Sequence, residues 1–451
     1  MLALVSPAAD STNTTLDTLL LRNGDSLDGK LLSIDPSQVL RWKCPDVAEP
    51  IEFKLDGVSQ FDLHTSPPAD RGNNFPCKVS LTQGDVLEGG LVSCNRDTLC
   101  LQTWYAGQLK IPRKDVQSIY FLPTTPDIFT LIGAEGWTQG KVEGLPNIES
   151  GQWIFRDGAF YADKSASLAR DIKLPDSADL QFDLAWNGSL TLSLALYTDS
   201  LQPILLADKD KAPKFGGFYS LRFYSLFVDV GRIKPMEPLV YLPPVVVPAL
   251  SQTNRVHVDI RARKKSNTLA LAVDGQWLQV WTDTNGFAGE GTGVRFVQNV
   301  TQGGTSQVKI SNLRLAPWDG VWETDPTNVP PANQDAAWLT NSTTVSGVIE
   351  SIADGKLTVR GKKDAVEVPL GRVRRLVFAL QGEPAAELTA SVHATFAHGG
   401  PVTFKLESWA ADGVTVRSPI FGEARFDPNA FRRLVIHPPD SVASSGTNGL
   451  R

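Results

Sequence analysis

The feature that most constrains the fold of this 451-residue chain is a short segment that occurs four times. LRNGDSLDG at residues 21–29 recurs as LTQGDVLEG at residues 81–89. A third copy opens at residues 339–347, and a more divergent fourth copy covers residues 392–436. Self-similarity of this kind predicts repeated supersecondary units that bury their apolar faces against one another.

Each copy carries the signals of a small antiparallel β-unit. Gly24 follows Asn23 in a tight-turn sequence, where glycine supplies a positive φ. The strand after the turn alternates apolar and polar residues, so one of its faces is expected to be buried. A second glycine inside that strand, at Gly29, Gly89 and Gly347, predicts a bulge or a sharp bend.

The copies also share their last strand. Residues 368–378 (VPLGRVRRLVF) match residues 111–121 (IPRKDVQSIYF), and the RRLV of the third copy recurs in the fourth. Because a bent strand allows a short sheet to curl, we expect each copy to form a small barrel. In these motifs the copies resemble Sm-like or SH3-like small barrels. The resemblance implies four of them, at residues 14–66, 75–123, 336–380 and 388–437.

Residues 127–320 follow a different pattern, with longer strands. Apolar residues alternate from Leu190 to Leu196 and from Val256 to Ile260, and Asn187-Gly188 is a hairpin turn between such runs. Long antiparallel strands of this kind predict a two-sheet sandwich. The expected fold class is therefore all-β, with a central two-sheet jelly-roll sandwich between two pairs of small β-barrels.

The middle domain also resembles a known family in its sequence motifs. FDLAW at residues 182–186, VDGQW at 273–277 and WDG at 318–320 carry this likeness. They resemble the concanavalin A-like, laminin-G-like sandwiches, in particular the 3-keto-disaccharide hydrolase-like branch. The resemblance implies the sandwich fold. The family label alone also suggests an alternative function, a carbohydrate-active hydrolase or lyase that acts through the sandwich cleft. A fold of this kind hosts many functions.

Charge and hydropathy narrow the partners. A net charge of −6 gives no support to nucleic-acid binding, which requires clustered Lys and Arg. No apolar run approaches the roughly 18 residues that span a bilayer, so no membrane span is predicted. The opening MLALVSPAAD lacks a charged segment and is too short for a signal peptide, although it could be the stub of a processed one. We expect an exported protein, periplasmic or in the cell envelope, with no visible signal segment.

The residue types that usually carry catalysis are scattered. The five histidines follow none of the common catalytic or metal signatures, and no catalytic residue, metal or cofactor is predicted. His257 and Asp259 share one side of a strand, which favours an exposed strand face over a catalytic or metal pair. Cys94 and Cys100 flank a turn and could form a disulfide; the alternative, slightly favoured, is that all four cysteines are small buried residues.

Aromatic residues of the sandwich predict a glycan site. Exposed on a concave sheet face they would stack on sugar rings, whereas the alternative is that most of them belong to the core. The glycan-binding candidates are Trp186, Asn187, Arg222, Tyr224, Trp277 and Trp281.

A proline-rich apolar segment, residues 234–250, is expected to form an extended loop or arm, because proline cannot pair within a central strand. It packs either on its own sandwich or on a partner. The interface candidates are Leu239, Val240, Tyr241, Leu242, Val245, Val246 and Val247.

Together these patterns predict a non-catalytic exported scaffold or binding protein. Its sandwich would engage a glycan or a protein, and its small barrels would mediate assembly. The expected partners are another protein or a second copy of the chain, with a polysaccharide as a further ligand. A second alternative is a self-assembling structural subunit. Residues 438–451 are rich in Ser, Gly and Asn and are predicted to be a disordered tail.

Overall fold

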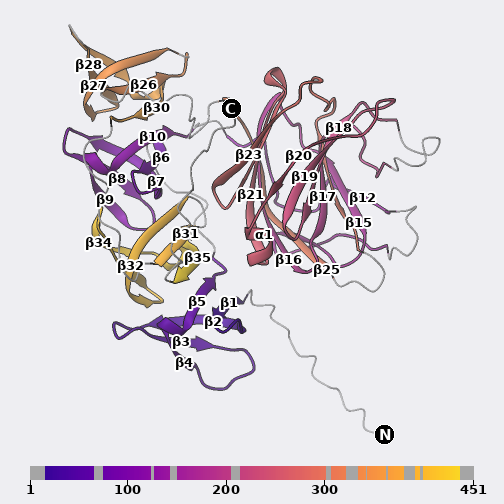
Figure 1. The fold of residues 1–451 in the computed structure, drawn as a ribbon, viewed down its shortest axis with the longest axis horizontal. Coiled ribbons are helices and arrows are strands. Elements are labelled where there is room, and N and C mark those ends of the chain that lie inside the picture. The colour runs from indigo at the N-terminus through magenta and orange to yellow at the C-terminus, as the bar shows by residue number, and fades with distance from the viewer. Residues whose placement is uncertain are drawn as a thin grey trace, which may run out of the picture. The chain divides into compact units, whose positions relative to one another are not determined.

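The computed structural model describes residues 16–65, 75–122, 126–142, 150–204, 214–300, 306–320, 334–341, 343–361, 364–379, 392–396 and 400–436. Antiparallel strands dominate these residues, which confirms the predicted all-β class (Figure 1). The chain divides into two compact units. Residues 1–122 and 323–451 form the repeat unit, and residues 123–322 form the sandwich unit. The opening ten residues and the predicted tail, 438–451, lie outside the described residues.

Each copy of the repeat forms five strands, with a 3₁₀ turn before the fifth. Repeat 1 comprises β1 (Asp17–Leu21), β2 (Ser26–Ile34), β3 (Val39–Lys43), β4 (Ile51–Lys54), η1 (Leu55–Gly57) and β5 (Val58–Asp62). Repeat 2 comprises β6 (Pro76–Leu81), β7 (Val86–Cys94), β8 (Thr98–Thr103), β9 (Gly107–Pro112), η2 (Arg113–Asp115) and β10 (Val116–Phe121). Repeat 3 comprises β26 (Asp335–Leu339), β27 (Thr344–Ala353), β28 (Lys356–Arg360), β29 (Ala365–Pro369), η4 (Leu370–Arg372) and β30 (Val373–Val377). Repeat 4 comprises β31 (Val392–Phe396), β32 (Pro401–Ala410), β33 (Gly413–Ser418), β34 (Gly422–Phe426), η5 (Pro428–Ala430) and β35 (Phe431–Ile436).

The repeats form two ten-stranded sheets, each of which joins two repeats through their fifth strands. β5 of repeat 1 pairs with β35 of repeat 4, with Phe61 opposite Leu434. β10 of repeat 2 pairs with β30 of repeat 3, with Ile119 opposite Leu376. The second strands of each pair also meet at one residue pair. Six strands drawn from two repeats therefore close one ring, where the sequence predicts one barrel for each repeat.

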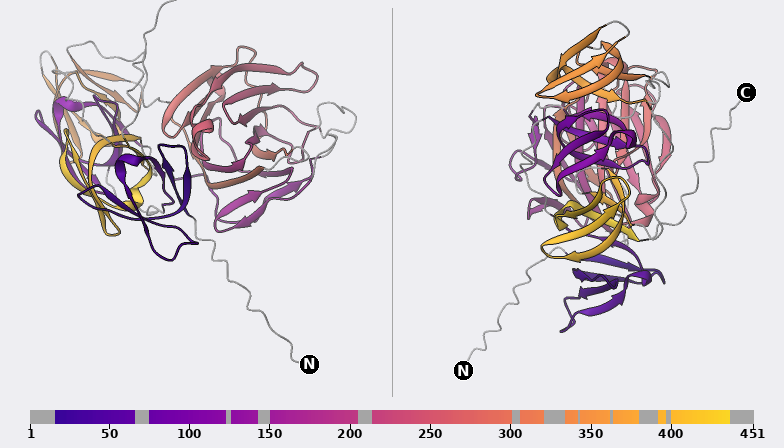
Figure 2. Two further views of the ribbon diagram at one scale, coloured as in Figure 1. Left: turned by 60° about the horizontal axis from the view of Figure 1, so that its bottom comes forward. Right: turned by 90° about the vertical axis from the view of Figure 1, so that its left-hand side faces the viewer.

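Repeats 2 and 4 also contact each other, and the backbone N–H of Asp427 donates to the backbone oxygen of Tyr105 at 2.7 Å. The backbone N–H of Thr403 donates to Asp85 Oδ1 at 3.1 Å. The ring of Tyr105 lies 4.9 Å from that of Phe396 and 5.6 Å from that of Phe426. Together with the two strand pairings, this contact orders the repeats 3, 2, 4, 1, which the right-hand view of Figure 2 shows as orange, purple, yellow and indigo.

The sandwich unit consists of two antiparallel sheets, as predicted. The eight-stranded sheet runs β13 (Ile154–Arg156), β14 (Ala159–Ala162), β25 (Ser306–Pro317), β16 (Ser177–Gly188), β21 (Arg255–Arg263), β22 (Thr268–Val273) and β23 (Gln276–Thr282), with β11 (Phe129–Thr130) also beside β25. The seven-stranded sheet runs β12 (Thr138–Gly140), β15 (Ala166–Asp171), β24 (Gly293–Gln298), β17 (Thr191–Thr198), β18 (Phe218–Tyr224), β19 (Phe227–Ile233) and β20 (Val240–Val246). Two short turns complete it, α1 (Ala249–Gln252) and η3 (Lys264–Ser266).

Alternate residues of the long strands fill the space between the two sheets. The ring of Phe182 lies 6.3 Å from that of Phe223 and 5.5 Å from that of Phe296, both on the opposite sheet. The intervening residues point outward, because successive side chains of a strand lie on opposite faces. The outer face of each sheet is therefore available for other roles.

The sequence predicts an extended arm for the proline-rich segment, whereas in the structure this segment forms an edge strand. β20 pairs with β19, and the register shifts between Val228 and Val230. Pro243 and Pro244 fall opposite this shift, and an edge strand tolerates residues that lack an N–H. The segment therefore belongs to the sandwich.

All four cysteines are free thiols, and three of them are buried. Cys94 lies opposite Leu99 and Cys100 opposite Ser93, so these two thiols point to opposite faces of the hairpin. Burial raises the pKa of Cys94 to about 11. Among the described residues, no helix is long and apolar enough to cross a membrane.

Candidate functional site

The outer face of the seven-stranded sheet holds a groove of about 270 Å³, which we call the sheet groove. Its floor is made by outward-facing residues of four neighbouring strands, β24, β17, β18 and β19. Ser193, Ser220 and Asn299 contribute polar atoms, and Phe218 and Ile233 contribute apolar surface. The arrangement combines an apolar base with polar groups, as is usual for small-molecule sites.

Arg222 is held rigidly at one side of the sheet groove. Its Nε and Nη2 donate to the two carboxylate oxygens of Asp229 at 2.6 and 2.7 Å. Burial lowers the pKa of Arg222, but the hydrogen bonds to Asp229 outweigh this and raise it. The guanidinium carbon lies 4.8 Å from the ring centre of Tyr241, so a planar cation rests against an aromatic ring.

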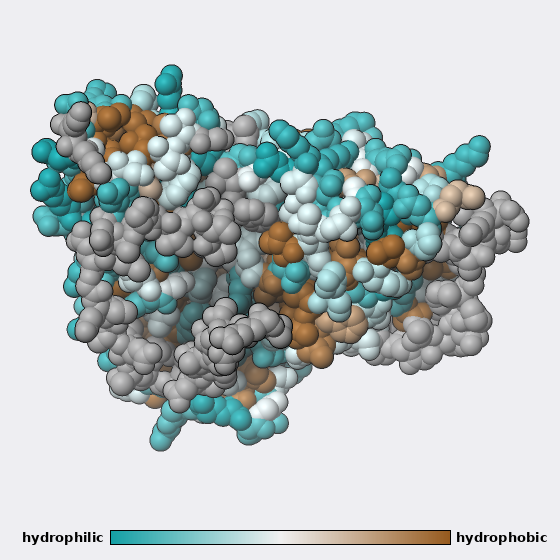
Figure 3. Space-filling view, turned by 45° about the horizontal axis from the view of Figure 1, so that its top comes forward, coloured by the Kyte–Doolittle hydropathy of each residue, from teal (hydrophilic) through white to brown (hydrophobic). Residues whose placement is uncertain are grey.

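Tyr241 comes from β20 and projects over the neighbouring strand. Its Cε1 lies 3.7 Å from the point that a Cβ would occupy on Gly231, so the ring lies directly over that residue of β19. Tyr241 is 51% exposed and Leu239 is 41% exposed. Figure 3 shows one face of the molecule, on which apolar patches interrupt a largely hydrophilic surface.

Arg295 lies in the floor of the sheet groove and is only 3% exposed. Its Nη1 donates to Ser200 O at 2.7 Å, Gln202 O at 3.1 Å and Thr198 Oγ1 at 3.3 Å. Its guanidinium carbon lies 5.0 Å from the ring centre of Phe218. In the part of the chain that the structure describes, Arg295 Nε has no hydrogen-bond partner.

The predicted glycan residues do not gather at one site. Arg222 lines the sheet groove, and Tyr224 follows on the same face of β18, with its ring centre 5.9 Å from the Arg222 guanidinium. Trp186 and Asn187 line a separate cavity of about 330 Å³ that also contains residues of β13, β14 and β25. Trp281 is buried and donates from Nε1 to Pro243 O at 2.7 Å. Trp277 is half-buried in β23, 4.6 Å from the guanidinium of Arg261.

The predicted interface residues are divided by the pleat of β20. Leu239, Tyr241 and Val246 are exposed, Val240 is half-buried, and Leu242 and Val245 pack partly against the core. Val247 is buried.

Sequence reasoning missed Arg295, Ser193 and Ser220. The available signal was a cation inside the apolar run VRFV at residues 294–297, where an alternating strand places it on the face opposite the core. Ser193 lies between Leu192 and Leu194, and Ser220 between Tyr219 and Leu221, on the same outward face of the sheet. Neither signal identifies a groove without the order of the strands.

His257 pairs with a carboxylate other than Asp259. Its Nδ1 lies 2.8 Å from Asp183 Oδ1, and Asn312 Nδ2 donates to the other oxygen of Asp183 at 2.8 Å. Asp259 Oδ2 lies 3.6 Å from Arg261 Nη2. Among the described residues, no cluster of three or more His, Cys, Asp or Glu side chains could hold a metal ion.

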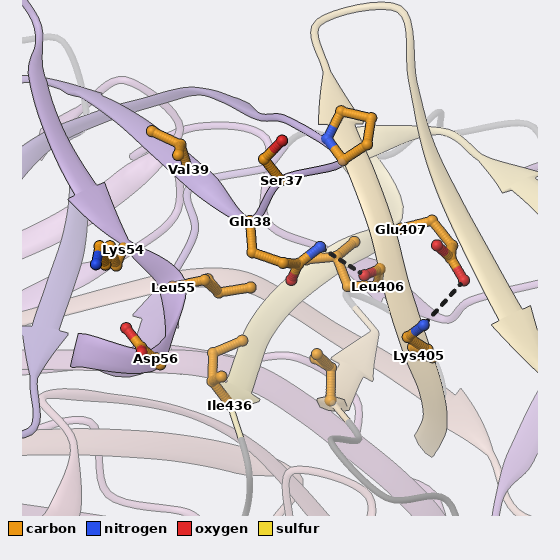
Figure 4. Close-up of a pocket in the computed structure, with 12 residues that line it drawn as sticks. Ser37, Gln38, Val39, Lys54, Leu55, Asp56, Lys405, Leu406, Glu407 and Ile436 are labelled. Carbon is orange, nitrogen blue, oxygen red and sulfur yellow. Dashed lines mark hydrogen bonds and ion pairs between the residues drawn. The ribbon is translucent and has the colours of Figure 1, made fainter.

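A third cavity, of about 520 Å³, lies between repeats 1 and 4. Leu55 and Ile436 contribute apolar surface, and Gln38 Nε2 bridges the two repeats by donating to Leu406 O at 3.3 Å. Figure 4 shows this bridge beside the ion pair of Lys405 and Glu407, whose charged atoms lie 3.6 Å apart. Charged residues line this cavity from both repeats, Lys54 and Asp56 from repeat 1 and Lys405 and Glu407 from repeat 4.

Comparison with known proteins gives structural likenesses only. No family model and no curated protein matches the chain. The structure is similar to a legume lectin-like domain from Entamoeba histolytica, at 11% identity and a TM-score of 0.33, over 44% of this chain and 100% of that one. It is also similar to the Emp46p carbohydrate recognition domain (12%, TM-score 0.32, over 44% and 100%) and to the carbohydrate binding module CBM66 from Bacillus subtilis (15%, TM-score 0.23, over 40% and 94%). Likenesses of this size do not bear on the ligand or activity of this chain.

Proposed function

We propose that this chain is a non-catalytic binding protein whose sandwich, of the concanavalin A-like kind, engages a saccharide in the sheet groove. The observation that carries the proposal is the contact of Arg222 with Tyr241 at the edge of that groove. An exposed ring offers an apolar face to a sugar, and a guanidinium held in place by Asp229 offers oriented hydrogen-bond donors. The neighbouring serine hydroxyls add donors and acceptors.

Binding is favoured over hydrolysis in the sheet groove. Hydrolysis of a glycosidic bond ordinarily needs two carboxyl groups about 5–10 Å apart. The described residues that line the groove include no Asp and no Glu. The alternative of a carbohydrate-active hydrolase or lyase therefore has no support from the described residues of this groove.

The repeat unit is proposed as a platform for assembly. Its six-stranded rings each draw strands from two repeats, which makes one extended body from short units.

The sandwich unit offers a further apolar surface for a partner. Val246, on the edge strand β20, is 62% exposed, and a partner protein or a second copy would cover it. Export to the periplasm or cell envelope belongs to the same proposal, and none of the four free thiols adds support to it.

The proposal is tested by replacing Tyr241 with alanine. Because the ring is half exposed and stacks on one neighbour, Y241A is expected to keep the melting temperature within a few degrees and to weaken glycan binding about tenfold in calorimetry, the equivalent of one aromatic contact. Hits are first identified on a glycan array. The matched control is Y161A, a half-buried tyrosine beside Trp186 in the other sandwich cavity. Loss of binding in Y161A but not in Y241A would contradict the assignment of the groove.

A further inference from the structure

Arg295 is a buried charge that makes no ion pair within 4.0 Å among the described residues. Its Nη1 donates to two backbone carbonyls and a hydroxyl, all neutral, and its Nε is unsatisfied within the described residues. Removing a guanidinium from water is costly unless hydrogen bonds and an opposite charge replace the water. The three neutral oxygens that bind Nη1 replace only part of the hydration that the guanidinium loses on burial.

The other arginines of this part of the sheet differ. Arg222 forms a bidentate ion pair with Asp229, and Arg232 Nε donates to Asp283 Oδ2 at 2.9 Å. Arg295 lies in no ion pair within 4.0 Å among the described residues. Among the arginines of β18, β19 and β24, Arg295 is therefore the one that has no carboxylate partner among the described residues.

The surroundings of Arg295 leave the groove floor positive. Burial lowers the pKa of Arg295 to about 10, and the charge of Asp199 opposes that effect from beyond ion-pair range. Asp199 is itself engaged, because its Oδ2 accepts from the N–H of Gly216 at 2.8 Å. At neutral pH the guanidinium is protonated, and the groove therefore favours a ligand that carries a negative charge.

We infer that the sheet groove takes an acidic saccharide, in which the carboxylate of a uronic acid residue pairs with Arg295 while the sugar ring lies against Tyr241. The inference rests on the proposed function and names the ligand class of the same groove. A carboxylate matches the planar donors of a guanidinium, and charge-assisted hydrogen bonds of this kind are about twice as strong as neutral ones. A sulfate ester shares the charge but differs in shape, so the experiment separates the two.

The test uses the full chain and oligosaccharides of galacturonate, glucuronate and mannuronate, each beside its carboxyl-reduced form. We expect at least one uronate to bind about tenfold or more tightly than its reduced form in calorimetry, because reduction replaces the carboxylate with a neutral hydroxymethyl group and leaves the rest of the saccharide unchanged. Equal affinity for the acidic and reduced forms would overturn the inference and leave the proposed function standing. Failure of every saccharide, neutral and acidic, would overturn the proposed function itself.

Variants link the preference to Arg295. R295M keeps the apolar stem and removes the charge, and it is expected to abolish the preference for the acidic form. The matched control is R314M, which alters a half-exposed arginine of β25 on the eight-stranded sheet and is expected to retain the preference. A preference that persists in folded R295M would overturn the inference. If R295M does not fold, the wild-type comparison decides alone. Tighter binding of a sulfated neutral oligosaccharide, or of a polyglutamate peptide, than of any uronate would also overturn it.

Discussion

At the scale of single residues, the repeats treat buried carboxylates in two ways. Asp17 in repeat 1 accepts from the backbone N–H of Leu31 at 3.3 Å and of His64 at 2.8 Å. Asp335, at the matching position of repeat 3, accepts from Ile349 and Ala379, both at 2.8 Å. These carboxylates tie the second strand to the end of the fifth. Charge burial is tolerated there because both oxygens are satisfied.

Asp85 in repeat 2 is a different case. It is 2% exposed, and within the described residues its Oδ2 has no hydrogen-bond partner. Burial raises its pKa from 3.8 to about 6, against the opposing hydrogen bonds from Thr403. A raised pKa in the folded state means that the contribution of Asp85 to stability is present below pH 4 and is lost as the pH rises through about 6.

We therefore expect D85N to stabilise the protein at pH 7.5, by roughly 1–3 kcal/mol for a shift of this size, and to have little effect at about pH 3.5, below both pKa values. Urea denaturation at the two pH values measures the difference. The control is D25N, which alters the exposed aspartate of the equivalent turn in repeat 1 and should give no such pH dependence. An equal loss of stability at both pH values in D85N would show that the carboxylate does not titrate in this range.

At the scale of the strand, the second glycine of the repeat has a role that its position alone does not predict. In repeat 2 the register of this strand shifts just after the glycine, between Leu91 and Ser93. Repeat 4 has the same shift, between Leu406 and Ser408, with Phe404 at the position that corresponds to the glycine. A Cβ on Gly89 would lie 2.5 Å from the carbonyl oxygen of Gln102 in the next strand. The glycine is therefore needed for close approach of two strands, in addition to marking a bend.

Gly89→Ala should consequently destabilise the protein by roughly 1–3 kcal/mol, because the clash is with backbone that cannot rotate away. The measurement is the free energy of unfolding in urea. Gly57→Ala is the matched control: no described residue lies within 4 Å of its Cβ position, and alanine should be neutral or slightly stabilising there. Equal effects of the two substitutions would refute the close-approach explanation.

Strand patterns predicted the sheets better than they predicted the site. Alternation shows that a residue faces inward or outward but not which strands become neighbours, and the sheet groove depends on β24 lying beside β17. Trp281 and Arg222 both occur in alternating strands, yet one packs in the core and the other lines the groove. The proline-rich segment was predicted as an arm because proline weakens a strand, and the edge position that accommodates it was not visible in the sequence.

At the scale of the molecule, the pairing of repeats is nested: the first joins the fourth, and the second joins the third. The sequence shows four copies and the inserted sandwich, but their fifth strands have similar apolar patterns and so do not specify which copies pair. Phe61 and Ile119 both meet a leucine of a distant repeat. Each half of the repeat unit thus supplies strands that the other half needs to close its rings.

This nesting makes the two halves of the repeat unit interdependent. In residues 1–122, β5 lacks β35 and β10 lacks β30, so the apolar fifth strands have no partner. We expect fragment 1–122 alone to give no cooperative urea transition, and to form a 1:1 complex with fragment 323–451 in light scattering after co-refolding. Fragment 123–322, whose strands all pair within the sandwich unit, is the control and should unfold cooperatively by itself. A cooperative monomer formed by fragment 1–122 would show instead that two repeats close without their distant partners.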